Sequence, residues 1–271
     1  MSETIEKKEL FSLPEGKAYS IRITNNTGDY IDVTNYGARL LDMFVHTPSG
    51  EMKNILPEIP EHDPASIETH PETILFGSDL SGLSQKLWDI AEEANSSVLM
   101  TAETSSDVKV GIRITWVNLN RLILDFFVTP REALSVRLSS CLSFDKGKYE
   151  VSSFSQEVNG LPVNDTPYNN MAFIPLKEAG DTFSSAGGDI KPMLEVKDTA
   201  SPLRISLYST MECAKVCSGD SHIELTSFPE VPEELLAGET LTERVICGID
   251  YITTNLASDE NDPESPFLGF F

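Results

Sequence analysis

The chain has 271 residues, 40 % of them hydrophobic and 23 % charged, which is the composition of an ordinary globular protein. Its 43 acidic and 20 basic residues give a formal net charge of −23, which disfavours nucleic acid and anionic membrane surfaces as partners. No apolar run is long enough for a membrane span, and the N-terminus lacks the pattern of a signal peptide. Together with four cysteines that form no CxxC pair, these features predict a cytoplasmic protein.

Short segments with alternating apolar and polar residues follow one another along the chain, as is typical of half-buried strands. Residues 19–23 and 31–33 are separated by a turn sequence, Asn25-Asn26-Thr27-Gly28-Asp29. Residues 108–116 and 122–128 flank the short turn Asn118-Leu119-Asn120 and predict a hairpin. Similar segments occur at 98–101, 136–142, 203–208 and 245–251. Because no long segment has helical spacing, the sequence predicts an all-β sandwich or barrel.

Two segments do not have the strand pattern. Residues 58–71 are rich in proline and acidic residues, which favours a surface loop with at most one helical turn. Residues 257–271 begin acidic and end in Phe267-Leu268-Gly269-Phe270-Phe271, and we expect this C-terminal tail to pack against the domain. No repeat or linker divides the chain, so residues 1–271 are predicted to form a single domain.

Several motifs occur in the order in which the aldose 1-epimerase (galactose mutarotase) family has them. Thr34-Asn35-Tyr36-Gly37-Ala38 resembles an early signature of that family. Later matches are Leu75-Phe76-Gly77, the strand at 138–145, the turn Leu161-Pro162-Val163-Asn164-Asp165, and the segment 223–232. The resemblance covers nearly the whole chain. It implies a large antiparallel β-sandwich, the galactose mutarotase-like supersandwich, whose concave face holds a monosaccharide.

The resemblance also implies a chemistry. Mutarotation needs a base that removes the proton of the anomeric hydroxyl and an acid that protonates the ring oxygen. In the family these are a glutamate and a histidine, and Glu224 matches the glutamate, four residues before Phe228-Pro229. A glutamate on a strand is otherwise usually a solvated surface residue, so the surrounding motif is what favours a site.

The matches to the family's histidines fail. The position of the acid falls at Cys141, and that of a second, sugar-holding histidine falls at Phe76. The segment that carries an arginine in the family is replaced in this chain by the loop at 58–71. A thiol is a poor proton donor near neutral pH and Phe cannot donate at all. Since loss of a general acid costs roughly 10²–10⁴-fold in rate, standard mutarotation is expected to be impaired.

Other residues could replace the missing groups. His222 lies two residues before Glu224, so on a strand the two side chains share a face. His70, or its neighbour His62, could reach the groove from the loop, although loop histidines are more often exposed. The predicted catalytic residues are therefore Glu224, His222 and His70. The predicted substrate-binding residues are Phe76, Cys141, Lys215 and Trp88, with core packing as the alternative for the tryptophan.

Three functions remain open. The first is a carbohydrate-binding relative of aldose 1-epimerases that has lost the catalytic histidines. The second is an active epimerase, an isomerase acting on a sugar or sugar phosphate through Glu224 and a relocated histidine. The third is a scaffold or interaction protein. No sequence pattern indicates a metal or an organic cofactor, and the sequence carries no indication of oligomeric state.

Overall fold

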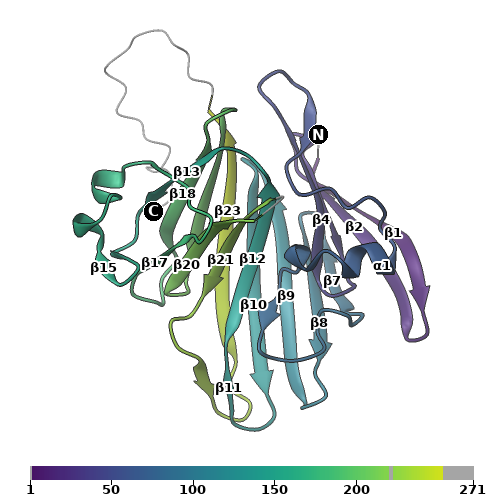
Figure 1. The fold of residues 1–271 in the computed structure, drawn as a ribbon. Coiled ribbons are helices and arrows are strands. Elements are labelled where there is room, and N and C mark those ends of the chain that lie inside the picture. Colours follow the sequence, from purple (N-terminus) through teal and green to yellow (C-terminus); the bar gives the residue numbers. More distant parts are fainter. Residues whose placement is uncertain (1, 220–221, 253–271) are drawn as a thin grey trace.

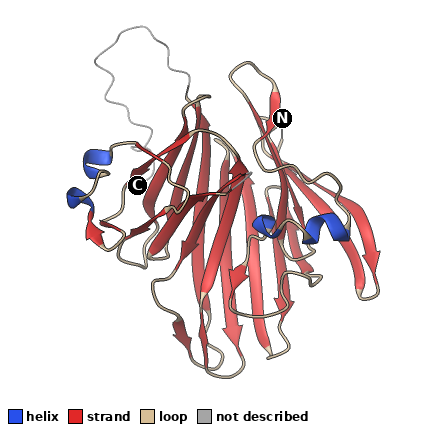
Figure 2. Ribbon diagram, viewed as in Figure 1, coloured by secondary structure: helices blue, strands red, loops and turns tan. Residues whose placement is uncertain are grey.

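The computed structural model describes residues 2–219 and 222–252. The predicted C-terminal tail, residues 257–271, lies outside the described residues. The described chain is built almost entirely from antiparallel strands, with a few short helices at the periphery (Figure 2). None of its helices has the length and apolar character that crossing a membrane requires.

The strands form three large sheets and one small ribbon. The N-terminal sheet contains β1 (Thr4–Leu13), β2 (Gly16–Thr24), β3 (Tyr30–Thr34), β4 (Arg39–His46) and β5 (Met52–Asn54), which alone keep the order of the chain. The nine-stranded sheet contains, from edge to edge, β16 (Ile174–Pro175), β13 (Tyr149–Ser153), β18 (Lys191–Asp198), β19 (Leu203–Ser209), β23 (Leu241–Tyr251), β10 (Arg121–Pro130), β9 (Val108–Val117), β8 (Ser97–Glu103) and β7 (Asp89–Ala94). The seven-stranded sheet contains, from edge to edge, β15 (Leu161–Pro162), β14 (Glu157–Val158), β17 (Asp181–Ser184), β20 (Cys213–Ser218), β21 (His222–Phe228), β12 (Leu138–Asp145) and β6 (Gly77–Ser78). The ribbon pairs β11 (Leu134–Val136) with β22 (Glu233–Leu235).

The predicted all-β class is confirmed. β9 and β10 form the predicted hairpin, with Val117 opposite Arg121 and Val108 opposite Pro130. In Figure 1, β1, β2 and β4 lie at one side of the molecule, β15 and β17 lie at the other, and the long strands of the nine-stranded sheet run between them. One cluster of buried apolar side chains, from Ile21 in β2 to Ile249 in β23, connects all three large sheets.

Trp116 links the nine-stranded sheet to the N-terminal sheet. Its side chain is fully buried, and its Nε1 donates a hydrogen bond of 3.0 Å to the carbonyl of Asp29. Nearby, the Asn25 amide donates to the Asn120 side chain at 3.0 Å. Trp116 is thus a core residue, and these two bonds connect β9 and the turn after it to the turn between β2 and β3.

A segment between β5 and β6, residues 55–75, covers one end of the seven-stranded sheet, and we call it the capping segment. It contains α1 (Pro64–Glu68) and the 3₁₀ helix η1 (Pro71–Thr73); two more 3₁₀ helices, η2 (Val163–Asp165) and η3 (Asn169–Met171), lie elsewhere. Asp63 caps α1 by accepting a hydrogen bond of 2.8 Å from the Ser66 amide. The predicted loop at 58–71 thus contains the single helical turn that its sequence allowed.

The capping segment is held by a buried arginine of β4. Arg39 is 2 % exposed, and its guanidinium donates to the carbonyls of Ile67 (3.0 Å), His70 (2.9 Å) and Ser84 (3.1 Å). It also donates to the Thr73 hydroxyl at 3.1 Å. Burial lowers the pKa of Arg39, but a guanidinium remains charged near neutral pH. The carbonyl dipoles therefore replace the water that the charge has lost.

Candidate functional site

Polar side chains gather on one face of the seven-stranded sheet. In β21 the odd-numbered residues are buried and the even-numbered ones are partly exposed, as the period-two pattern predicts. Register places Ser143 of β12 and Cys217 of β20 on either side of Glu224, and Cys141 and Lys215 on either side of Thr226. We call this surface the Glu224 face, and it comprises Cys141, Ser143, Lys215, Cys217, His222, Glu224 and Thr226.

His222 and Glu224 form a hydrogen-bonded pair. The Nε2 atom of His222 lies 2.9 Å from Oε1 of Glu224, with 16 % of the histidine side chain and 36 % of the glutamate side chain exposed. The expectation that the two side chains share a face is met, because residues two apart on a strand point to the same side. The pair combines a carboxylate with an imidazole, and both side chains remain partly exposed to a ligand.

Two thiols flank the pair. Cys217 Sγ donates to Glu224 Oε2 across 3.7 Å, and Thr226 donates to Cys141 Sγ across 3.7 Å. Burial raises the pKa of Cys141 to about 11 and, with the neighbouring Glu224 charge, also raises the pKa of Cys217. Both thiols are therefore neutral at physiological pH and hold their protons more tightly than an ordinary cysteine does. Neither has the chemistry of a general acid at neutral pH.

The capping segment closes the space in front of Cys141. A cavity of only about 10 Å³ remains there, between β12 and residues such as Pro57, Thr73 and Leu75. That is about the volume that a single water molecule needs. A sugar ring therefore does not fit beside Cys141 in this conformation, whereas Glu224, farther along the same face, is partly open.

The closure depends in part on one hydrogen bond. The hydroxyl of Ser143 donates to the carbonyl of Glu72 in η1 at 3.0 Å. We expect Ser143→Ala to lower the free energy of unfolding by about 1 kcal/mol, because one partly buried carbonyl loses its partner. Chemical denaturation measures this change. The exposed serine variant Ser105→Ala serves as the control, and an equal effect of both substitutions would count against the proposed anchor.

Of the other predicted site residues, Lys215 belongs to this face and the histidines of the capping segment do not. His70 Nδ1 is 2.6 Å from the carbonyl of Ser66, so its imidazole is held within the capping segment. His62 instead contacts Asp42 of β4, with Nε2 3.5 Å from Oδ2. Lys215 is partly exposed on the Glu224 face. The structure thus brings together Glu224, His222, Cys141 and Lys215 on one sheet and places His70 in the capping segment.

Phe76 and Trp88 are core residues. They are 3 % and 1 % exposed, and their ring centroids lie 5.3 Å apart. Phe76 also packs on Phe126 of β10 at 5.8 Å, and Trp88 Nε1 donates to the carbonyl of Leu83 at 3.0 Å. A ring buried on all sides offers no surface to a sugar, so the predicted substrate-binding role of these two residues is not supported. Both side chains pack in the core, which is the alternative role predicted for Trp88 from the sequence.

The described residues contain no group of three or more His, Cys, Asp or Glu side chains placed to hold a metal ion. The fold does bring together polar residues that no sequence motif connects. Asp42, Glu58 and Asp145 come from three distant segments and line one cleft. Of the three, Asp42 is the one that the sequence weakly indicates as a site residue, since it is the one charged residue between Leu40 and Val45 in an otherwise apolar strand.

Comparisons with known proteins identify the fold. No family model and no curated protein sequence matches the chain. Among solved structures, a GalM/aldose epimerase homologue from C. elegans is similar with a TM-score of 0.71 and 12 % identity, over 87 % of this chain and all of that one. Galactose 1-epimerase from Lactobacillus acidophilus NCFM gives a TM-score of 0.70 and 12 % identity over 92 % and 99 % of the two chains. A putative aldose 1-epimerase from Escherichia coli K12 gives 0.65 and 11 % over 87 % and 100 %.

Proposed function

Because the chain has the fold of galactose mutarotase-like β-sandwiches, as its sequence resemblance implied, we propose that it is a divergent relative that binds a monosaccharide on the Glu224 face. We further propose that it lacks the standard mutarotase chemistry. The observation that carries this proposal is the accessible His222–Glu224 pair. The nearby thiol of Cys141 is covered by the capping segment, and its raised pKa keeps it protonated.

The Glu224 face offers the groups that a sugar requires. Glu224 accepts hydrogen bonds from hydroxyl groups, and the imidazole of His222 holds that carboxylate in place. Lys215 and Thr226, which are paired across β20 and β21, supply a cationic donor and a hydroxyl on the same face. Carboxylate, ammonium and hydroxyl groups together match the mixed donors and acceptors of a polyol.

The direct test is a calorimetric titration with D-galactose, D-glucose and glucose 6-phosphate. We expect saturable binding of at least one of them at millimolar or lower concentration. Glu224→Gln should weaken that binding about tenfold or more, because it removes a charge-assisted hydrogen bond. The matched control is Glu157→Gln, since Glu157 is exposed on β14 and lies outside the Glu224 face. A flat titration with the whole panel would favour a scaffold role instead.

A second candidate function is an active epimerase in which Glu224 is the base and His222 the acid. The contact of 2.9 Å between them favours it, since the two groups could exchange a proton through a sugar. Against it, the two groups hydrogen bond with each other from one strand and do not flank a space. Polarimetry of freshly dissolved α-galactose separates the two functions: acceleration above buffer that is lost in both Glu224→Gln and His222→Gln would establish the epimerase.

A further inference from the structure

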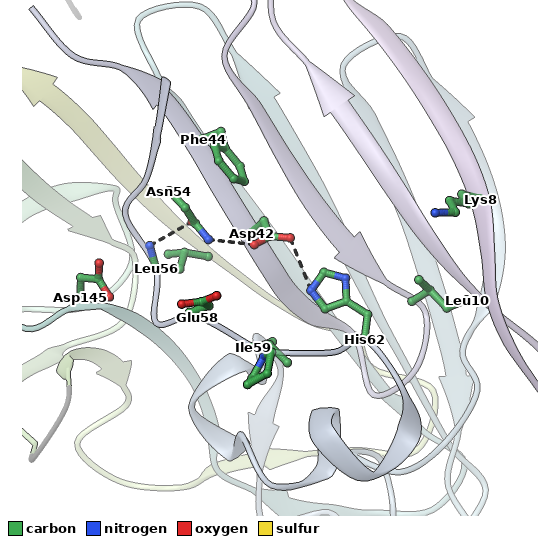
Figure 3. A pocket seen from close by; sticks show the side chains of 11 residues that line it. Lys8, Leu10, Asp42, Phe44, Asn54, Leu56, Glu58, Ile59, His62 and Asp145 are labelled. Carbon is green, nitrogen blue, oxygen red and sulfur yellow. Dashed lines mark hydrogen bonds and ion pairs between the residues drawn. The ribbon is translucent and has the colours of Figure 1, made fainter. Parts of the chain in front are cut away.

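A second polar cleft borders the Glu224 face at Asp145 of β12, which is paired with His222. It is formed by the outer surface of β1 and β4, the chain after β5, and the end of β12 (Figure 3). Its volume is about 510 Å³. That is within the range of roughly 300–1,000 Å³ typical of small-molecule sites. No residue that the sequence matches to a catalytic residue of aldose 1-epimerases lines it.

The carboxylate of Asp42 lines the cleft and is held in place by its neighbours. Asp42 accepts a hydrogen bond of 2.8 Å from the Asn54 amide, and its other oxygen faces His62 Nε2 at 3.5 Å. Asn54 is itself fixed, because its side-chain oxygen accepts from the backbone amides of Met43 and Leu56 at 3.1 and 3.2 Å. Figure 3 shows Asp42 between Asn54 and His62, all three on the same side of the cleft. The carboxylate is therefore held in one position before any ligand arrives.

Two further carboxylates line the cleft. Glu58 is exposed on the capping segment, and Asp145 ends β12, where its amide donates to the Ile55 carbonyl at 3.0 Å. Burial raises the pKa of Asp42 and of Asp145; for Asp145 the charge of Lys53 opposes this shift and that of Glu58 adds to it. The lining thus carries three carboxylates against the ammonium of Lys8 and the imidazole of His62, while Arg22 and Lys53 act on Asp42 and Asp145 from outside it. A bound cation would relieve this surplus of negative charge.

The remaining lining is apolar. The ring of Phe44 lines the cleft and stacks on Tyr30 at 4.9 Å between centroids, so its orientation is fixed. Leu56 and Ile59 extend this apolar surface along the capping segment. An aromatic ring beside aliphatic side chains suits the C–H face of a sugar ring, whereas the carboxylates suit its hydroxyl groups.

We infer that this cleft binds a protonated amino sugar. Its ammonium group lies between Asp42 and the pair Glu58 and Asp145, its hydroxyl groups donate to the remaining carboxylate oxygens, and its ring packs on Phe44. The surplus negative charge selects the amine over a neutral hexose, since charge-assisted hydrogen bonds are stronger than neutral ones. The cleft adjoins the Glu224 face at Asp145, but Asp42, Glu58 and Phe44 lie outside that face, so the inference does not depend on the function proposed for it.

The test is a calorimetric titration at neutral pH with D-glucosamine, D-glucose and N-acetyl-D-glucosamine, in which only the first carries a charge. It uses both the wild-type chain and Glu224→Gln, so that binding at the Glu224 face is distinguished from binding in the cleft. We expect D-glucosamine to bind at least about tenfold more tightly than either neutral sugar, in both proteins. Asp42→Asn and Glu58→Gln should each weaken D-glucosamine binding about tenfold, whereas the exposed control Glu157→Gln leaves it unchanged.

Because Asp42 is hydrogen bonded within the fold, thermal unfolding verifies that Asp42→Asn is native, and the exposed Glu58 provides a variant that does not depend on that result. The inference is overturned by any of three outcomes. These are equal affinity for the charged and neutral sugars, D-glucosamine binding that Glu58→Gln leaves intact, and the absence of saturable D-glucosamine binding at millimolar concentration.

Discussion

Replacing Arg39 with leucine is expected to lower the free energy of unfolding by about 3–5 kcal/mol, because it removes a buried, hydrogen-bonded charge and leaves its acceptors unpaired. Those acceptors are the carbonyls of Ile67, His70 and Ser84, together with the Thr73 hydroxyl. The leucine side chain can fill part of the volume but can donate to none of them. The effect should therefore exceed that of an ordinary surface substitution several times over.

Arg39→Leu should also loosen the capping segment. Three of those acceptors belong to the capping segment, which closes the space beside Cys141. Arg39→Leu should thus increase hydrogen exchange and proteolysis at residues 63–73 more than elsewhere. Arg131→Leu is the control, because Arg131 is exposed and its contact with Asp107 is a surface ion pair worth less than about 1 kcal/mol. Equal stability losses in urea denaturation of the two variants would contradict the role assigned to Arg39.

The substitution Gly37→Ala is expected to cost about 3 kcal/mol or more, through backbone strain and a steric clash. Gly37 has a φ of +74°, and a Cβ atom there would lie 2.2 Å from the carbonyl oxygen of Ser84. The backbone cannot easily move away, because the Gly37 amide donates to the Lys86 carbonyl at 2.9 Å. This close approach explains why the turn after Thr34-Asn35-Tyr36 requires glycine.

Gly50→Ala is the matched control for that prediction. Gly50 has a similar φ of +83°, but nothing lies within 4 Å of the Cβ position. Its substitution should cost only the conformational strain, about 1 kcal/mol. Thermal denaturation of the two variants separates strain from clash, and a Gly37→Ala protein no less stable than Gly50→Ala would show that the contact with Ser84 is easily relieved.

Much of the fold was predictable from the sequence because alternation is a local property. The hairpin of β9 and β10 and the strands β2, β3, β8, β19 and β23 all follow from their alternation. β1 was not predicted, because four of its ten residues are charged and its apolar and polar residues do not alternate regularly. As an edge strand paired only with β2, it buries little apolar surface.

The site was predictable only where neighbours in sequence are neighbours in space. The His222–Glu224 pair follows from a spacing of two on one strand, and the structure contains it. The burial of Phe76 depends on Trp88 and on Phe126 of β10, two residues that no local pattern connects to it. The cleft around Asp42 likewise joins β1, β4, the capping segment and the end of β12, so its charge could be recognised only after folding.

The location of the sugar is the central claim, and an NMR titration of the labelled protein with the tightest-binding hexose of the panel tests it most directly. If the sugar binds as proposed, the amide signals of Cys217, Glu224 and Thr226 shift together and saturate with the calorimetric affinity. A hexose that binds while these three signals stay in place, with all shifts confined to other strands, would contradict the proposal.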